Sequence, residues 1–471
     1  MSKFKNNIKP VSQPTKKGEL AHTLKRRHVV MISIGGIIGA GLFVGASAAI
    51  NAAGPAVLFS YIITGFLIYF VMRMLGELVI ENPQLGSFIN HIRNGMGDNT
   101  AFIMGWGYWL FWISAIAAEA IAGGEIILRY FNISQDYNFL GTMVIGPILI
   151  ISMMITNLFS VKGYGEFEFW FALIKVIAIA LFIVVGAMAL THLFGHVDNQ
   201  IKTYTCYFGF VPKGWLAIFT IIPTILFTVT GSEIATIAAA ESDDPAENVA
   251  YATQTIIFRV MAFYIAAVAI ILAILPWNET IPGISPFLMT LQKINIPYAS
   301  DIMAFIILVA ILSCLNSSIY ATSRTLFELA EYDDAPNWLT QTNASGVPQR
   351  AILTASLIGI VISIIAVISP NLFFASLLSC AGSIIVAVYV AICISQINVR
   401  KKMYLDNRVP TFKMWLFPYL SWATIAAFVL IILCMLFDIQ QRKQIVLSAL
   451  TLSFIWLFRV LLCRLRIKSI P

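Results

Sequence analysis

Long apolar runs separated by short polar gaps dominate this chain of 471 residues. A helix needs about 20 such residues to cross a bilayer. Twelve runs meet that length, at 29–50, 55–75, 100–129, 141–160, 167–190, 215–240, 251–276, 300–329, 350–369, 372–396, 414–437 and 444–463. Within them apolar and polar residues do not alternate, as they would in barrel strands. The pattern predicts an all-α membrane protein with 12 transmembrane helices and no large soluble domain.

The composition agrees with this pattern, since 59% of the residues are apolar and 11% are charged. Soluble domains are nearer 45–50% apolar and about 25% charged. These values exclude a disordered chain, a disulfide-stapled chain and a soluble nucleic-acid-binding protein. The six cysteines lack metal-ligand spacing, and the five histidines lie in tails and loops. We therefore expect no metal, no cofactor and no enzyme active site.

The basic residues orient the predicted spans. Residues 1–28 form a polar, basic tail, and we place this tail in the cytoplasm. With that choice, 23 of the 30 lysines and arginines lie on the inner side and six on the outer side. Because inner loops carry the excess of positive charge, we predict that both termini are cytoplasmic. The one remaining basic residue is Lys175, inside the fifth run.

Two of the runs contain residues that disfavour a continuous helix. The first run includes Gly35-Gly36-Ile37-Ile38-Gly39-Ala40-Gly41, and the sixth includes a segment from Pro223 through Gly231 to Glu233. Glycines in a helix cost roughly 1 kcal/mol each relative to alanine. The glycine tract is explained either by close helix packing or by an unwound segment whose free N–H groups bind a carboxylate.

Runs one and six are five apart, so the two interruptions fall at corresponding positions of two five-helix halves. Paired interruptions of this kind are typical of inverted-repeat transporters. We therefore divide the chain into a tail (1–28), a first repeat (29–190), a second repeat (191–396) and a final pair of spans (397–471).

Few ionisable residues lie at membrane depth, and each is a candidate functional group. Lys175 lies about nine residues into its run, roughly 13 Å along a helix. It is a candidate for reversible protonation, or a structural residue that binds backbone carbonyls of the broken first span. Glu119 and Glu233 are assigned evenly to the substrate pocket and to structure, whereas Glu125, nearer the outer end, favours a structural role.

Two further charged pairs have the spacing of neighbours on one helix face. Arg73 and Glu77 are four residues apart, and Arg324 and Glu328 repeat the arrangement. The spacing predicts an ion pair within each helix.

Several tracts resemble the bacterial amino acid permeases of the amino acid–polyamine–organocation (APC) superfamily. These tracts are 24–43, 75–77, 82–83, 86–88, 164–177, 238–242, 313–318 and 334–336. Tracts 236–242, 275–278 and 414–418 are most similar to the γ-aminobutyrate (GABA) permease branch. The loop Glu331-Tyr332-Asp333-Asp334 departs from the family, where this position is usually basic.

The resemblance implies a LeuT-like 5+5 inverted repeat with broken helices 1 and 6, proton-coupled alternating access and a multi-pass location in the bacterial inner membrane. Lys175 matches a lysine that replaces a sodium ion in related carriers, so sodium coupling is not expected. The substrate-binding residues implied are Gly39, Ala40 and Gly41 for the carboxylate, backbone around Phe227, Thr228 and Thr230 for the amine, and Phe227 as a gate.

The sequence therefore predicts a proton-coupled amino-acid importer whose partners are an amino acid, protons and the lipid bilayer. The substrate stays open between γ-aminobutyrate and a proline, aromatic or cationic amino acid, the last favoured if Glu119 binds an amine. An amino-acid sensor or channel is the rival class, although no row of pore-lining polar groups stands out. The oligomeric state is also open.

Overall fold

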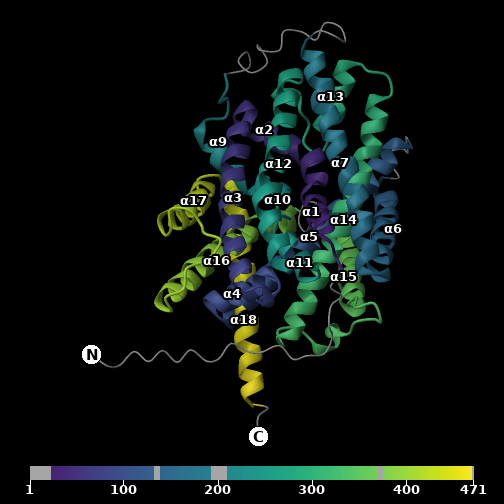
Figure 1. The fold of residues 1–471 in the computed structure, drawn as a ribbon. Helices are drawn as coiled ribbons and strands as arrows, with labels where there is room; N and C mark the ends of the chain where they lie inside the picture. The colour runs from purple at the N-terminus through teal and green to yellow at the C-terminus, as the bar shows by residue number, and fades with distance from the viewer. Residues whose placement is uncertain (1–22, 132–137, 192–208, 369–374, 469–471) are drawn as a thin grey trace.

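The computed structural model describes residues 23–131, 138–191, 209–368 and 375–468. This part of the chain consists of helices and connecting loops, and its only β-structure is an isolated bridge between Leu24 and Ser242. Figure 1 shows the helices as one bundle, with α1 and α10 near its centre. Most of the predicted tail (residues 1–22) and the junction of the two predicted repeats (192–208) lie outside the described residues.

The helices and short helical turns follow one another in this order: α1 (Arg26–Ile37), η1 (Gly41–Gly45), α2 (Ala46–Ala53), η2 (Gly54–Ala56), α3 (Val57–Glu81), η3 (Pro83–Leu85), α4 (Phe88–Met96), α5 (Asp98–Tyr130), α6 (Asn138–Phe159), α7 (Val161–Leu190), α9 (Trp215–Thr220), α10 (Ile222–Val229), α11 (Ile234–Ala240), α12 (Pro245–Ile274), η5 (Trp277–Glu279), α13 (Pro286–Ile294), α14 (Ala299–Glu331), η6 (Asn337–Thr340), α15 (Gln349–Ile368), α16 (Ala375–Leu405), α17 (Tyr419–Met435) and α18 (Ile439–Lys468).

Nine helical stretches of the described chain are long and apolar enough to cross a membrane. The first, Arg26–Glu81, contains the predicted runs 29–50 and 55–75. Runs 251–276 and 414–437 correspond to the shorter apolar stretches Val260–Ile274 and Tyr419–Met435. The structure thus confirms an all-helical chain with several membrane-crossing helices, and the count of twelve stays a prediction.

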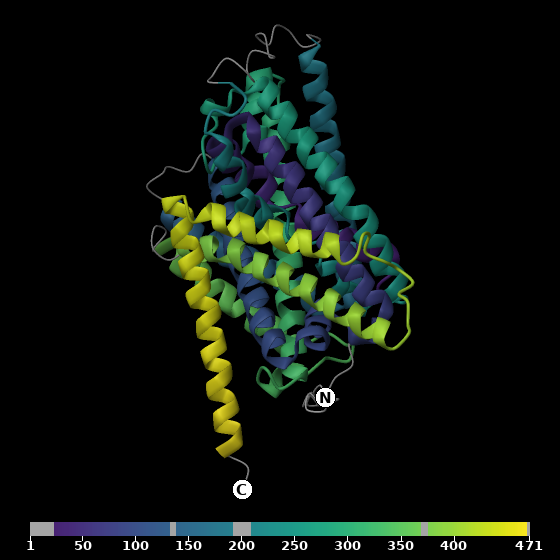
Figure 2. The ribbon, with the colours of Figure 1, turned by 90° about the vertical axis from the view of Figure 1, so that its left-hand side faces the viewer.

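Helix α7 illustrates how these helices face lipid. Its exposed side includes Trp170, Ile177 and Leu181, whereas Glu168 and Lys175 are fully buried inside the bundle. A helix surrounded by hydrocarbon is expected to turn its apolar side chains outward and its charged side chains inward. Figure 2 shows α16, α17 and α18 along one side of the bundle, with α18 extending beyond it.

Both predicted helix interruptions are present. Helix α1 ends at Ile37, and the π-helical turn η1 begins at Gly41. Helix α10 ends at Val229, and α11 begins at Ile234. Gly231, in the second interruption, has φ +134°, and a Cβ there would lie 2.8 Å from the carbonyl carbon of Gly36. The glycine tract is thus interrupted between Ile37 and Gly41, and its Gly36 also packs closely against Gly231. The substrate-binding role of its N–H groups stays a prediction.

At the end where α1 begins, the chain segment before α1 crosses the bundle. The Leu24 N–H donates to the Glu241 carbonyl at 3.0 Å, and the Asp243 N–H donates to the Leu24 carbonyl at 3.2 Å. The Arg324 guanidinium on α14 binds the Glu241 carboxylate at 2.8 Å. These contacts join α1, α11 and α14 and close this end.

The two charge pairs predicted from helix spacing are wrong. Glu77 binds Arg400 of α16 at 3.2 Å, and Arg73 donates to a backbone carbonyl in the segment before α17. Arg324 binds Glu241, and Glu328 accepts a hydrogen bond from Ser87. Glu77 and Arg324 are buried and pair with charges from other elements, which satisfy them better than an exposed helical neighbour would.

Candidate functional site

The interruption of α1 exposes backbone carbonyls that side chains from other helices satisfy. The Lys175 ammonium on α7 donates to the Gly35 carbonyl at 2.8 Å and to the Ile38 carbonyl at 2.6 Å. A helix end buried in a membrane needs such partners, because no water is present to replace them. Lys175 therefore caps the broken end of α1, as one of its two predicted roles requires.

Two more side chains donate hydrogen bonds to backbone carbonyls at the interruption. The Cys314 thiol on α14 lies 3.5 Å from the Gly36 carbonyl. The Tyr264 hydroxyl on α12 lies 2.9 Å from the Ile37 carbonyl and 3.2 Å from the Thr228 carbonyl, at the end of α10. Tyr264 thus contacts both broken helices, and its role was not predicted from the sequence.

Glu119 approaches the same interruption from α5. Each of its carboxylate oxygens lies 3.1 Å from the backbone nitrogen of Ala40, which donates to them. Ala40 belongs to the backbone that the resemblance assigned to the substrate carboxylate. A carboxylate of the protein itself therefore occupies one of the donors expected to bind the substrate.

Glu233 lies at the second interruption and is fully buried. Its carboxylate accepts hydrogen bonds from the Tyr108 hydroxyl at 3.1 Å, the Tyr389 hydroxyl at 3.2 Å and the Gly231 N–H at 3.3 Å. These contacts tie α5 and α16 to the end of α10. Glu233 is not among the residues that line the central cavity.

A central cavity of about 30 Å³ lies between the two interruptions. It brings together most of the predicted binding residues and adds Cys314 and aromatic residues of α5. The lining residues are Gly36, Ile37, Gly39, Gly41, Phe111, Trp112, Ala115, Ala118, Glu119, Phe227, Thr228, Thr230 and Cys314. Since a water molecule needs about 10–15 Å³ of such space, the cavity has room for no more than two or three waters, and its walls must separate to admit an amino acid.

Glu168 is a buried carboxylate that the sequence analysis did not select. It lies seven residues, or two helical turns, before Lys175 on α7 and is fully buried against Gly35. The Ser313 hydroxyl and the Asn316 amide of α14 donate to it, the latter at 3.1 Å. The signal was its spacing from Lys175, which places both charges on the inward face of one helix.

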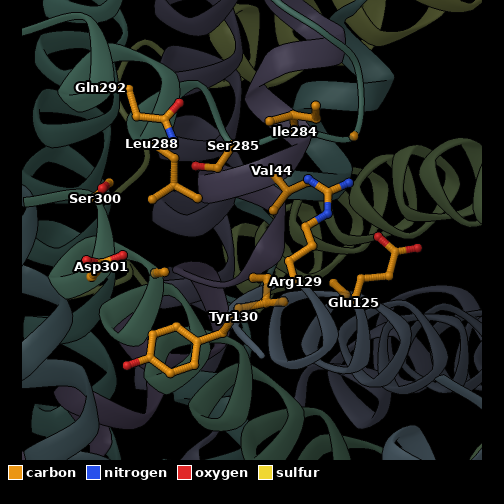
Figure 3. A pocket seen from close by; sticks show the side chains of 14 residues that line it. Val44, Glu125, Arg129, Tyr130, Ile284, Ser285, Leu288, Gln292, Ser300 and Asp301 are labelled. Carbon is orange, nitrogen blue, oxygen red and sulfur yellow. The ribbon is translucent and has the colours of Figure 1, made fainter. Parts of the chain in front are cut away.

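A larger cavity of about 540 Å³ lies at the Tyr130 end of α5 (Figure 3). The charge pattern predicts that this end faces outward. Glu125, for which a structural role was favoured, lines it together with Arg129, Asp301 and Ser285. Val44 of η1 also lines it, so the turn that follows the α1 interruption borders both cavities.

The acidic loop after α14 holds a buried ion cluster. The Asp334 carboxylate binds Arg93 of α4 and Arg459 of α18, each at 2.6 Å. Burial alone would lower the pKa of Arg93. The attraction of the Asp334 and Asp98 carboxylates is stronger than this effect, so the pKa of Arg93 is raised. Asp334 thus joins α4, α18 and the loop that follows α14 through ion pairs.

The chain is similar to known amino-acid transporters over most of its length. The family model described as "Amino acid permease" matches residues 28–470. A "Probable GABA permease" from Pseudomonas aeruginosa is 40% identical over 92% of this chain and 91% of its own. The "Gamma-aminobutyric acid permease" of Bacillus subtilis is 40% identical over 91% of each chain. The "Aromatic amino acid transport protein AroP" of Corynebacterium glutamicum is 34% identical over 92% of this chain and 93% of its own.

Proposed function

The chain belongs to the amino acid permease family of transporters, and from that premise we propose that it imports γ-aminobutyrate together with protons. The observation that carries the proposal is the small cavity between the ends of two interrupted helices. Free backbone groups at such ends bind the charged ends of an amino acid without a dedicated side chain.

The carboxylate of the substrate binds at the backbone of Gly39, Ala40 and Gly41 in this proposal. The Ala40 N–H is held by Glu119 in the closed cavity, so substrate binding displaces the Glu119 carboxylate. The amine binds carbonyls near Thr228 and Thr230, and Phe227 closes over it. Glu233 fixes the end of α10 through its contacts with Tyr108 and Tyr389.

Proton coupling is assigned to Lys175. Its ammonium binds two carbonyls at the α1 interruption, so loss of its proton removes two charge-assisted hydrogen bonds from that end. Protonation of Lys175 therefore changes the stability of the broken helix that binds the substrate.

The architecture that goes with this proposal has twelve spans, both termini in the cytoplasm and a location in the bacterial inner membrane. The two inverted repeats are residues 29–190 and 191–396, with α1 and α10–α11 as the matching broken helices and 397–471 as the final spans. The contacts of Leu24 with Glu241 and Asp243 then close the cytoplasmic end.

An aromatic amino acid is the second candidate substrate. Phe111, Trp112 and Phe227 line the central cavity and would pack against an aromatic ring. The similarity to aromatic amino acid transport proteins gives the same alternative.

Uptake into proteoliposomes tests the proposal. We expect labelled γ-aminobutyrate to accumulate only when a proton gradient is imposed, and unlabelled phenylalanine to compete weakly. Lys175→Ala is expected to bind substrate but not to accumulate it uphill. Failure of every amino acid in a competition panel to be driven by the gradient would refute the transport proposal, and stronger competition by phenylalanine would reassign the substrate.

A further inference from the structure

The outer cavity has the size and shape of a ligand site. Its volume of about 540 Å³ lies within the roughly 300–1,000 Å³ range of small-molecule pockets. The walls come from α5, η1, the segment before α13, α13 and α14. Four separate segments of the chain therefore converge on one concave space at the outer end of the bundle.

The charges in this cavity suit a zwitterion. Arg129 and Glu125 lie on one side and Asp301 on the other in Figure 3, and they come from two helices, α5 and α14. Among the described residues none of the three forms an ion pair within 4 Å. A cation and an anion facing one another across a cavity match a ligand with a carboxylate and an ammonium group.

A buried hydroxyl supports ligand binding independently of these charges. Ser285 is 4% exposed, lines the cavity, and its Oγ has no hydrogen-bond partner in the described part of the chain. Buried polar atoms are rarely left unpaired in folded proteins. The Ser285 hydroxyl is thus a free donor or acceptor next to the separated charges.

The outer cavity also lies on a route to the central one. Val44 lines the outer cavity, and Gly41, three residues earlier at the start of the same turn, lines the central cavity. On α5, Ala122 lines the outer cavity and Glu119, three residues earlier, lines the central one. A ligand held outside is separated from the central cavity by about one helical turn.

We propose that the outer cavity is a second amino-acid binding site, in which Arg129 binds the carboxylate and Asp301 the ammonium group before the substrate enters the central cavity. This inference rests on the proposed transport of a zwitterionic amino acid. Ser285 contributes a further hydrogen bond.

Equilibrium binding of tritiated γ-aminobutyrate to the purified chain tests this site. Wild type is expected to bind two molecules, and Arg129→Gln and Asp301→Asn are each expected to bind one, because losing a charged partner weakens the outer site by about tenfold or more. Lys293→Gln is the matched control, since it removes a positive charge at the same end, outside the lining residues. It should keep two. The single molecule retained by the first two variants also demonstrates that they are folded.

Two compounds separate the ends of the ligand. Butyrate lacks the ammonium group and butylamine lacks the carboxylate, so each should compete for the outer site far less well than γ-aminobutyrate. The outer site would be overturned if wild type bound only one molecule of γ-aminobutyrate, or if Arg129→Gln and Asp301→Asn both still bound two. This holds even if uptake is driven by protons. Two-site binding without any gradient-driven uptake would instead overturn the proposed function and leave the outer site standing. No binding at all would overturn both.

Discussion

The backbone N–H of Ala40 has a single hydrogen, and that hydrogen lies between the two carboxylate oxygens of Glu119. A substrate carboxylate bound at the same place would meet a group of its own charge. Glu119 therefore acts in one of two opposite ways. It competes with the substrate carboxylate, or it attracts the substrate ammonium group as one sequence-based hypothesis holds.

The substitution Glu119→Gln distinguishes these roles. We expect the KM of uptake to fall by about tenfold, because removing one charge–charge conflict contributes roughly 1.4 kcal/mol. The measurement is the initial rate of uptake against substrate concentration. Glu279→Gln, which removes an exposed carboxylate outside both cavities, is the control. A rise in KM would mean that Glu119 attracts the ammonium group.

His91 governs stability in acid. It lies in α4, outside the membrane-crossing stretches, and is fully buried with no partner for either ring nitrogen among the described residues. Burial lowers its pKa to about 3, from 6.5. Between these values the unfolded chain binds the proton and the folded chain does not, so stability falls as the pH falls below 6.5.

The expected loss is about 1.4 kcal/mol per pH unit within this window. The apparent Tm in detergent should therefore drop between pH 7 and pH 5 in wild type. In His91→Leu the drop should be smaller, because leucine takes up no proton in either state. An equal drop in both proteins would contradict the assignment.

At the scale of elements, Asp334 joins α4, α18 and the loop that follows α14. Its side chain is 1% exposed, and those of Arg93 and Arg459 are 2% and 13% exposed. Removing one partner of such a buried group leaves the remaining charges without compensation, which costs about 3–5 kcal/mol.

Asp334→Asn is accordingly expected to lower the apparent Tm strongly, as measured in detergent. Asp406→Asn is the control, because Asp406 pairs with Arg408 at 3.5 Å on the surface, where both side chains are at least half exposed. Exposed pairs contribute about 0–1 kcal/mol. Similar Tm values for the two variants would show that the buried cluster does not hold these elements together.

Glycine made the helix interruptions predictable, since the backbone preferences of Gly39 and Gly231 are local properties. Pro223, which also contributed to the prediction, lies instead in the first turn of α10. The helix pairs assigned to Arg73 and Arg324 were wrong because spacing ranks only neighbours on the same helix. Their true surroundings come from segments distant in sequence. Glu168 was missed for the same reason, as its importance arises from Gly35 and Ser313 on other helices.

At the scale of the whole molecule, the two ends of the bundle differ. The end where α5 finishes contains the cavity of about 540 Å³, whereas Leu24 is fully buried at the end where α1 begins. Leu24 packs on Gly165 of α7, where an added Cβ would lie 2.8 Å from its Cδ2 atom. A small residue at position 165 is therefore needed for this end to close.

The substitution Gly165→Val should hold Leu24 away and open this end. Cys314 borders the central cavity, so its thiol reports the opening. In a background where the other five cysteines are serine, a water-soluble reagent applied from the side where α1 begins should label Cys314 several-fold faster in Gly165→Val.

Gly163→Val is the control for this experiment. Position 163 lies two residues earlier on α7, and within 4 Å an added Cβ there meets only the Ser160 hydroxyl. Its labelling should match that of the parent protein. Equal rates in all three proteins would show that Leu24 does not close this end.

The Tyr264 hydroxyl lies within hydrogen-bond distance of two carbonyls, one at the end of α1 and one at the end of α10. A phenol carries one hydrogen, so it donates to Ile37 or to Thr228 but not fully to both. Whenever a ligand's ammonium group takes one carbonyl, the hydroxyl is free to turn to the other. The two broken helices therefore compete for one donor, so a ligand that takes the carbonyl of one helix leaves the hydroxyl to the other.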